Sequence, residues 1–239
     1  MSLPEHRQSA VHILAPTFTL HEDRLAVLTT WAEGKHSLPN TYLRADHPDL
    51  PAVTRQALYS AFGDAQPTLE PVTTYIRSES KNDDIEIGYA ALARLVDISS
   101  NPALIPVPLP HIEGRSLGLT DIEIEFTKLG LEAFRKFPNI SWSARLQHPD
   151  TLPRLARLVE NPRRFTIAEL RVAYEALLYD TMDPSGRPQS AEDYIDPANF
   201  QRTVRDTPIV PLSEQYVGKG RPASLWTMPP AVLTGNTTR

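Results

Sequence analysis

The chain has 239 residues, a net charge of −5 and 41% hydrophobic residues, so a packed core is expected rather than wholesale disorder. It contains no cysteine, which excludes disulfides and thiolate chemistry, and no apolar run long enough to cross a bilayer. Because no signal-peptide pattern begins the chain, we expect a cytoplasmic protein with no membrane partner.

The first hundred residues predict a small mixed α/β domain. Residues 10–14 and 25–31 are leucine-rich or β-branched and flank a polar turn, so they predict a hairpin. A loop-like segment, residues 34–48, precedes a helix that is expected to begin at Asp49 and end at Gly63. Two further strands are predicted, at residues 72–77 and 86–96.

The middle of the chain predicts a connection followed by helices. Residues 101–110 are rich in proline, which predicts an extended connection across a surface. Helical periodicity follows over residues 122–137, with apolar anchors at Ile122, Phe126, Leu129 and Phe134. A short helix is predicted next, around Leu152, Leu155, Leu158 and Val159. We place the domain boundary between about residues 138 and 150, giving domains 1–145 and 146–239.

A capping box begins the predicted helices of the second domain. Thr166 and Glu169 have the Thr-x-x-Glu spacing in which each side chain bonds the other residue's amide. The apolar residues that follow share one helix face: Leu170, Ala173, Tyr174 and Leu177. Residues 180–194 form a predicted loop, which is long for a helix-turn-helix connection.

Residues 196–228 predict a helix, a strand, a basic tip and a second strand. Asp196 is a good N-cap, and Pro197 suits the first helical position. Phe200 and Val204 then face a core, whereas Ala198, Gln201, Arg202 and Arg205 lie on the opposite face. Glutamine and arginine side chains can hydrogen-bond base edges in a DNA major groove. The strands contain residues 209–212 and 225–228, and residues 218–221 form the flexible tip between them.

The charge of this region is modest. Residues 197–226 hold four basic residues, Arg202, Arg205, Lys219 and Arg221, against Asp206 and Glu214. Such a patch is a weak electrostatic footprint for DNA, and a dimer would be needed to make it useful. On these residues alone, a helix and hairpin with solvated charge is an equally good interpretation.

Three motifs in the last third of the chain resemble one protein family. They are residues 165–178, residues 195–202 and the Gly-Arg-Pro-Ala-Ser-Leu-Trp run at 220–226. In this order they are similar to the C-terminal winged helix of the Nudix-related transcriptional regulators, the NrtR family with its NadQ-type branch. The resemblance implies an α+β protein with an N-terminal Nudix-like α/β/α sandwich domain and a C-terminal winged helix-turn-helix domain.

The first two thirds resemble this family in outline, with the metal-binding residues replaced. Residues 38–43 resemble the Leu-Pro-Gly-Gly-Phe-Val entry of a Nudix box, with Asn40 and Thr41 in place of the two glycines. In that register, Ala57, Ser60 and Ala61 stand where glutamates would bind magnesium. We therefore expect no catalytic residues, no metal and no required cofactor, and a domain that binds ligands.

The family resemblance implies an NAD-related effector, such as NAD, ADP-ribose or ATP. If the pocket is retained, Arg55 and Arg77 could meet phosphates, and Trp31, Tyr42 or Tyr75 could stack on a base or nicotinamide ring. Lys35 is a weaker candidate, and Asn40, in the segment that resembles the entry of the Nudix box, is a further one. The simpler alternative is that Trp31 and Tyr75, which end predicted strands, are core residues.

On the DNA side, the winged helix implies a homodimer that reads double-stranded operator DNA as two half-sites. Gln201, Arg202 and Arg205 would face the groove, supported by Asn199 and Thr203. Lys219 and Arg221 at the wing tip would contact phosphate or the minor groove, and Arg163 and Arg164 ahead of the first helix would add backbone contacts. The expected function is a repressor of NAD biosynthesis or salvage genes. An atypical Nudix hydrolase acting on ADP-ribose and a nucleotide-binding adaptor are the alternatives.

Overall fold

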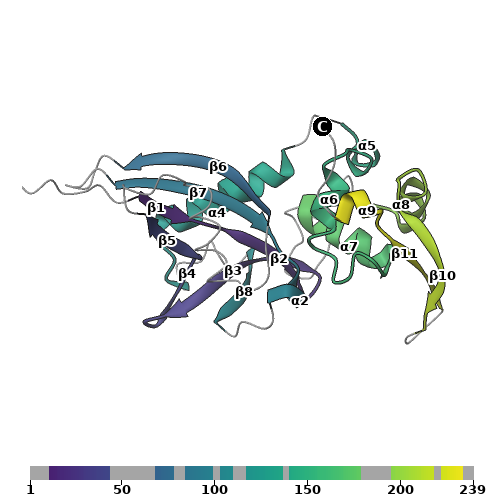
Figure 1. Ribbon diagram of the computed structural model, residues 1–239, viewed down its shortest axis with the longest axis horizontal. Helices are drawn as coiled ribbons and strands as arrows, with labels where there is room; N and C mark the ends of the chain where they lie inside the picture. The colour runs from purple at the N-terminus through teal and green to yellow at the C-terminus, as the bar shows by residue number, and fades with distance from the viewer. Residues whose placement is uncertain are drawn as a thin grey trace, which may run out of the picture. The chain divides into compact units, whose positions relative to one another are not determined.

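The computed structural model describes residues 11–43, 68–77, 84–98, 103–109, 117–136, 140–178, 195–217 and 222–233 (Figure 1). The chain divides into two compact units, Met1–Thr19 with Ala26–Ala133, and Leu20–Leu25 with Phe134–Arg239. The predicted helix at 49–63 and loop at 180–194 lie outside the described residues. None of the described helices is both long and apolar enough to cross a bilayer.

The first unit is built on one interrupted central strand. Strands β1 (Val11–Leu14) and β2 (Thr17–His21) both run parallel to β7 (Asp84–Leu92), one after the other. Between them, Pro16 has no amide hydrogen to donate, but its carbonyl accepts a hydrogen bond from the Ala91 amide at 3.0 Å. The line of pairing to β7 therefore continues across the interruption.

The remaining strands flank this line. Strand β6 (Thr68–Arg77) pairs antiparallel with β7, and β5 (Asn40–Leu43) pairs antiparallel with β1. Strand β3 (Arg24–Ala32) neighbours β2 and pairs antiparallel with β4 (Lys35–Ser37) and β8 (Leu104–Pro108). The chain thus passes through Leu38 and Pro39 from β4, which pairs with β3, to β5, which pairs with β1.

Several predicted strands need correction. The hairpin partner of β3 is β2, whereas the segment predicted to pair with it, β1, pairs with β5 and β7. The predicted loop at 34–48 contains β4 and β5, and the proline-rich connection contains β8. Proline is tolerated in a strand at an edge, where its missing amide faces no neighbour, and β3 is the partner of β8 in the described residues. The predicted strand at 86–96 ends at Leu92, and the short helix α2 (Leu95–Ile98) follows it.

The predicted helix after the proline-rich segment is confirmed as α4 (Asp121–Arg135). It packs closely on the sheet because Gly88 of β7 leaves room for Phe126, which is fully buried. A Cβ atom on residue 88 would lie 2.3 Å from the Phe126 ring, so a side chain there would force the ring to shift. The glycine therefore sets the distance between α4 and β7.

The second unit combines helices with a three-stranded antiparallel sheet. Its helices are α5 (Trp142–Leu146), α6 (Thr151–Leu155), α7 (Ile167–Leu178), α8 (Pro197–Val204) and α9 (Pro230–Leu233). The sheet has the order β10 (Val210–Tyr216), β11 (Ala223–Thr227), β9 (Phe165–Thr166). The predicted hairpin is confirmed as β10 and β11. Helix α5 and the two-residue strand β9 were not predicted.

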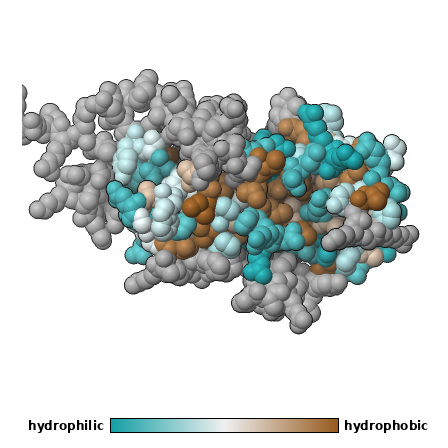
Figure 2. Space-filling view, turned by 90° about the horizontal axis from the view of Figure 1, so that it is seen from below, coloured by the Kyte–Doolittle hydropathy of each residue, from teal (hydrophilic) through white to brown (hydrophobic). Residues whose placement is uncertain are grey.

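Strand β10 is an edge of this sheet and is largely exposed along its length. Val210 and Tyr216 are 50% and 58% exposed, and the pairing with β11 is irregular between Pro211 and Gln215. In the space-filling view, the coloured surface at the right, the end at which Figure 1 draws β10 and β11, is mainly hydrophilic with some hydrophobic residues (Figure 2). The strand thus presents backbone and side chains to solvent on its free side.

The capping box at the start of α7 is confirmed. The Thr166 amide donates to Glu169 Oε2 at 2.6 Å, and the Glu169 amide donates to Thr166 Oγ1 at 3.2 Å. The predicted apolar face is also confirmed, because Leu170, Ala173, Tyr174 and Leu177 are fully buried. Local sequence therefore fixes both the beginning of α7 and the face that it buries.

Replacing Thr166 by alanine should destabilise the second unit by about 1 kcal/mol, because the hydroxyl that accepts the Glu169 amide and donates to Glu169 Oε2 at 2.9 Å is lost. Thr166→Ser keeps the hydroxyl and should stay close to the wild-type stability. Urea unfolding followed by circular dichroism measures both variants. Equal midpoints for alanine and serine would show that the box contributes nothing.

Candidate functional site

Helix α8 presents the exposed face that was predicted to read DNA. It begins as expected, since Asp196 Oδ1 accepts the Asn199 amide at 2.9 Å and Pro197 occupies the first turn. Phe200 and Val204 are fully buried. The Phe200 ring lies 5.6 Å from that of Tyr174 and 6.3 Å from that of Trp142, which anchors α8 on α7 and α5.

The opposite side of α8 is exposed and polar. Four of the predicted DNA contacts are exposed on it: Asn199, Gln201, Arg202 and Arg205. The fifth, Thr203, is half-buried and donates its hydroxyl to the Asn199 carbonyl at 3.0 Å. A long contact of 3.4 Å joins Arg202 Nη1 to Asn199 Oδ1, so that the amide helps to orient the guanidinium. The helix therefore displays two arginines, a glutamine and an asparagine together.

The start of α8 is tied to α7 by a charged pair. Arg171 Nη1 contacts Glu175 Oε1 at 3.1 Å and the carbonyl of Ile195 at 3.4 Å. Burial raises the pKa of the Glu175 carboxyl, and the neighbouring guanidinium opposes that shift. Arg171 thus links α7 to the residue that precedes the N-cap of α8.

A tight turn carries the predicted backbone contacts Arg163 and Arg164. Asn161 closes the turn, because its side chain accepts the Arg163 amide at 3.0 Å and its carbonyl accepts the Arg164 amide at 2.9 Å. Both arginines are exposed, and Arg164 Nη2 lies 3.0 Å from Glu214 Oε2 of β10. The remaining predicted contacts, Lys219 and Arg221, lie outside the described residues.

The candidate ligand-binding residues of the first unit fall into separate groups. Trp31 pairs in register with His36, and the two rings meet edge to face at 4.7 Å. Trp31 is 55% exposed, so the alternative interpretation of this residue as core is wrong. Lys35 is exposed, but it neighbours His36 on β4 and so lies on the other side of that strand.

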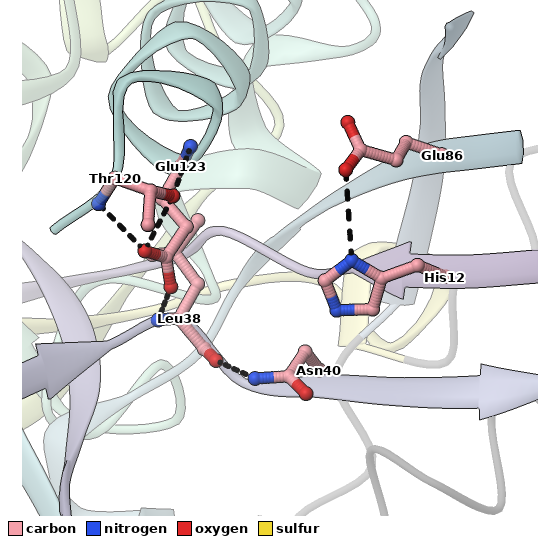
Figure 3. Close-up of polar contacts among 6 residues, drawn as sticks. All are labelled: His12, Leu38, Asn40, Glu86, Thr120 and Glu123. Atoms are coloured by element: carbon pink, nitrogen blue, oxygen red, sulfur yellow. Dashed lines mark hydrogen bonds and ion pairs between the residues drawn. The ribbon is translucent and has the colours of Figure 1, made fainter. Parts of the chain in front are cut away.

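A second aromatic pair lies on β5 and β1. Tyr42 stacks on His12 with ring centroids 4.4 Å apart. His12 Nδ1 lies 3.9 Å from Glu86 Oε1 (Figure 3). These three residues are direct neighbours across β5, β1 and β7, and Tyr75 of β6 continues the row beside Glu86. The backbone of Arg77 is placed opposite Asp84, whereas Arg55 lies outside the described residues. Asn40 Nδ2 donates to the Leu38 carbonyl at 2.8 Å.

Glu123 holds the turn between β4 and β5 and was missed from the sequence. Its carboxylate is buried at the first turn of α4 and accepts the Leu38 amide, the Thr120 amide and the Thr120 hydroxyl, each at 2.8 Å (Figure 3). The signal was present, since Thr120 and Glu123 have the same Thr-x-x-Glu spacing as Thr166 and Glu169. Both carboxylate oxygens are thus engaged in positioning the turn, and the described residues contain no group of three potential metal ligands.

No protein-family model and no curated protein matches this chain. Among solved structures, the chain is similar to Shewanella oneidensis NrtR complexed with a 27mer DNA, with a TM-score of 0.64 and 17% identity over 94% of this chain and 95% of that chain. A second structure of the same S. oneidensis protein has a TM-score of 0.64 and 19% identity over 93% of this chain and 95% of that chain. A MutT/nudix family protein from Enterococcus faecalis has a TM-score of 0.55 and 14% identity over 94% of this chain and 89% of that chain.

These likenesses concern the fold. At sequence identities below 20%, the TM-scores support a shared mixed α/β architecture along nearly the whole chain. The resemblance to the Nudix-related regulators, inferred from three motifs, is therefore confirmed at the level of the fold.

Proposed function

We propose that this chain is a DNA-binding transcription regulator whose first unit senses an NAD-related nucleotide. In this proposal, residues 1–145 form a Nudix-like ligand-binding domain and residues 146–239 form a winged helix-turn-helix. A homodimer acts in the cytoplasm as a repressor of NAD biosynthesis or salvage genes. NAD, ADP-ribose or ATP is the effector, and no enzymatic turnover takes place.

The arrangement of α8 is the observation that carries this proposal. An amphipathic helix with a buried apolar back displays Asn199, Gln201, Arg202 and Arg205 on its exposed side. These are the side-chain types that donate to guanine and adenine edges in a major groove. A hairpin follows the helix, and strand β9 ahead of α7 completes its sheet, in the order expected for a winged helix.

The proposal that DNA is the partner also has support from the full-length likeness to a structure with bound DNA. The similarity to the S. oneidensis NrtR–DNA complex covers 94% of this chain, including both units. One modest basic patch gives only weak affinity for DNA. Two copies of the chain on two half-sites are therefore proposed to supply the remaining affinity. Arg163, Arg164, Lys219 and Arg221 are proposed to contact phosphates around each recognition helix.

The absence of turnover is proposed from the replaced magnesium ligands. Alanine or serine stands at positions 57, 60 and 61, where the Nudix register expects glutamate. Of the buried carboxylates in the described residues, Glu123 is committed to the β4–β5 turn and Glu86 lies beside His12. These roles favour a binding domain over the alternative of an atypical hydrolase.

Gel shifts with promoter fragments of NAD genes test the proposal. The wild-type protein should shift a specific fragment at nanomolar concentration in physiological salt. One of the three nucleotides NAD, ADP-ribose and ATP should change the affinity for the DNA fragment when it is added. The concentration of that nucleotide should stay constant when the protein is incubated with it and magnesium. Failure to retard any such fragment, or release of AMP at ordinary enzyme rates, would overturn the assignment.

Glu214→Gln should strengthen DNA binding up to about fivefold at low salt, because the carboxylate that pairs with Arg164 is removed. Both side chains are more than half exposed, so the pair itself contributes little to stability. A salt titration of operator affinity measures the effect, which should shrink as the salt concentration rises. In an Arg164→Ala background the same change should have a smaller effect. A full gain in that background would show that Glu214 does not act through Arg164.

A further inference from the structure

The exposed Trp31 and the half-buried His36 form a ring pair, and the side chain of Thr29 contacts the imidazole. Thr29 is buried on β3, and its Oγ1 lies 3.1 Å from the carbonyl of Ile105 and 2.7 Å from His36 Nδ1. A hydroxyl has a single hydrogen, and the contact with the carbonyl requires it, because a carbonyl oxygen can only accept. Both contacts are hydrogen bonds at the same time only when His36 Nδ1 carries a hydrogen and donates it to Thr29.

This assignment decides what the other side of the imidazole can do. A neutral imidazole with hydrogen on Nδ1 has a lone pair on Nε2, which makes Nε2 a hydrogen-bond acceptor. His36 is half-buried, and its ring meets the 55%-exposed Trp31 at 74°. An edge-to-face contact covers less of the ring planes than the stacked contact between Tyr42 and His12. The pair therefore combines a flat apolar surface with a fixed acceptor.

We propose that Trp31 and His36 form the ring-binding part of the effector site. The indole stacks on a planar heteroaromatic ring, and His36 Nε2 accepts a hydrogen bond from an amino or amide group of that ring. This inference rests on the proposed binding of a nucleotide by the first unit. It adds His36 as a specificity-determining residue and Thr29 as a positioning residue.

The chemistry of the acceptor selects among nucleotides. Adenine presents an exocyclic amino donor and nicotinamide presents a carboxamide donor, and either matches the lone pair of Nε2. Hypoxanthine has a carbonyl oxygen in place of the adenine amino group, so in the adenine pose two acceptors would face each other, and its N1–H donor reaches Nε2 only if the ring shifts. The site should therefore favour adenine or nicotinamide nucleotides over hypoxanthine nucleotides.

The first part of the experiment uses the free full-length protein. Long-range ¹H–¹⁵N spectra of imidazole at pH 8 should show His36 with hydrogen on Nδ1 in the wild type and in Thr29→Ser. Thr29→Val removes the hydroxyl, and the His36 signals should shift towards the Nε2–H tautomer. A wild-type spectrum with hydrogen on Nε2 would overturn the proposal.

The second part titrates ADP-ribose and its hypoxanthine analogue into the same proteins. ADP-ribose should quench tryptophan fluorescence in the wild type and not in Trp31→Phe, and Trp31→Ala should bind it about tenfold more weakly. His36→Phe should lose about tenfold in affinity for ADP-ribose and most of the preference over the hypoxanthine analogue. His36→Gln, which can offer an amide oxygen, should recover part of both.

The outcomes separate this inference from the function on which it rests. If the wild type binds ADP-ribose and operator DNA, but the Trp31 and His36 variants bind the nucleotide equally well, the inference is wrong and the proposed function stands. If the wild type binds neither ADP-ribose nor NAD, nucleotide sensing fails and the inference fails with it. Operator affinity without nucleotide should be equal in all variants, because Trp31 and His36 belong to the first unit.

Discussion

Replacing Arg202 or Arg205 by alanine is expected to weaken operator binding about 10- to 100-fold each, which abolishes the shift in an ordinary gel assay. Both side chains are exposed on or just after α8, so their removal opens no cavity. The loss comes from hydrogen bonds to base edges and from one positive charge. Fluorescence anisotropy with operator DNA and with unrelated DNA separates the loss of base-edge hydrogen bonds from the loss of charge.

Two controls make this result specific. Arg202→Lys keeps the charge but cannot reproduce the two-pronged contact of a guanidinium, so it should lose specificity more than non-specific affinity. Lys128→Ala removes an equal charge from the exposed side of α4 and should leave operator binding within twofold. Wild-type operator affinity in both Arg202→Ala and Arg205→Ala would show that α8 is not the recognition helix.

Phe200→Ala is expected to destabilise the second unit by about 3–5 kcal/mol, a large part of the stability of a domain this size. The ring is fully buried and lies beside the rings of Tyr174 and Trp142, so it joins α8 to α7 and α5. Guanidinium unfolding followed by near-ultraviolet circular dichroism reports directly on these aromatic contacts.

The matched change is Gln201→Ala on the exposed side of the same helix. It should alter stability by less than about 0.5 kcal/mol while it weakens DNA binding. Phe200→Ala should lose DNA binding together with the folded signal, and cooling should restore part of both. A loss below about 1 kcal/mol for Phe200→Ala would mean that α8 is held by other contacts.

What the sequence predicted well depends on residues within four positions of one another. The N-cap at Asp196, the buried back of α8 and the box at Thr166 and Glu169 are all of this kind. Their hydrogen bonds form within one helical turn, so spacing alone determines them. The exposed side of α8 followed from the same periodicity.

What could not be predicted depends on partners far along the chain. The Thr29 hydroxyl meets a carbonyl 76 residues away, and Glu123 meets an amide 85 residues away. Strands β4 and β8 are short, polar or proline-rich, and only their register with β3 makes them strands. His36 did not stand out in the sequence, because its proposed role depends on Trp31, its neighbour on the adjacent strand β3.

The exposed edge of β10 has a consequence for solubility. An unpaired strand edge is a template on which a second chain can add by backbone pairing, which leads to aggregation. Strand β10 carries three features that oppose this: a proline at position 211, a charged carboxylate at Glu214 and an irregular pairing with β11 between Pro211 and Gln215. The hairpin can therefore stay open to a large partner, while identical strands are discouraged from joining it in concentrated solution.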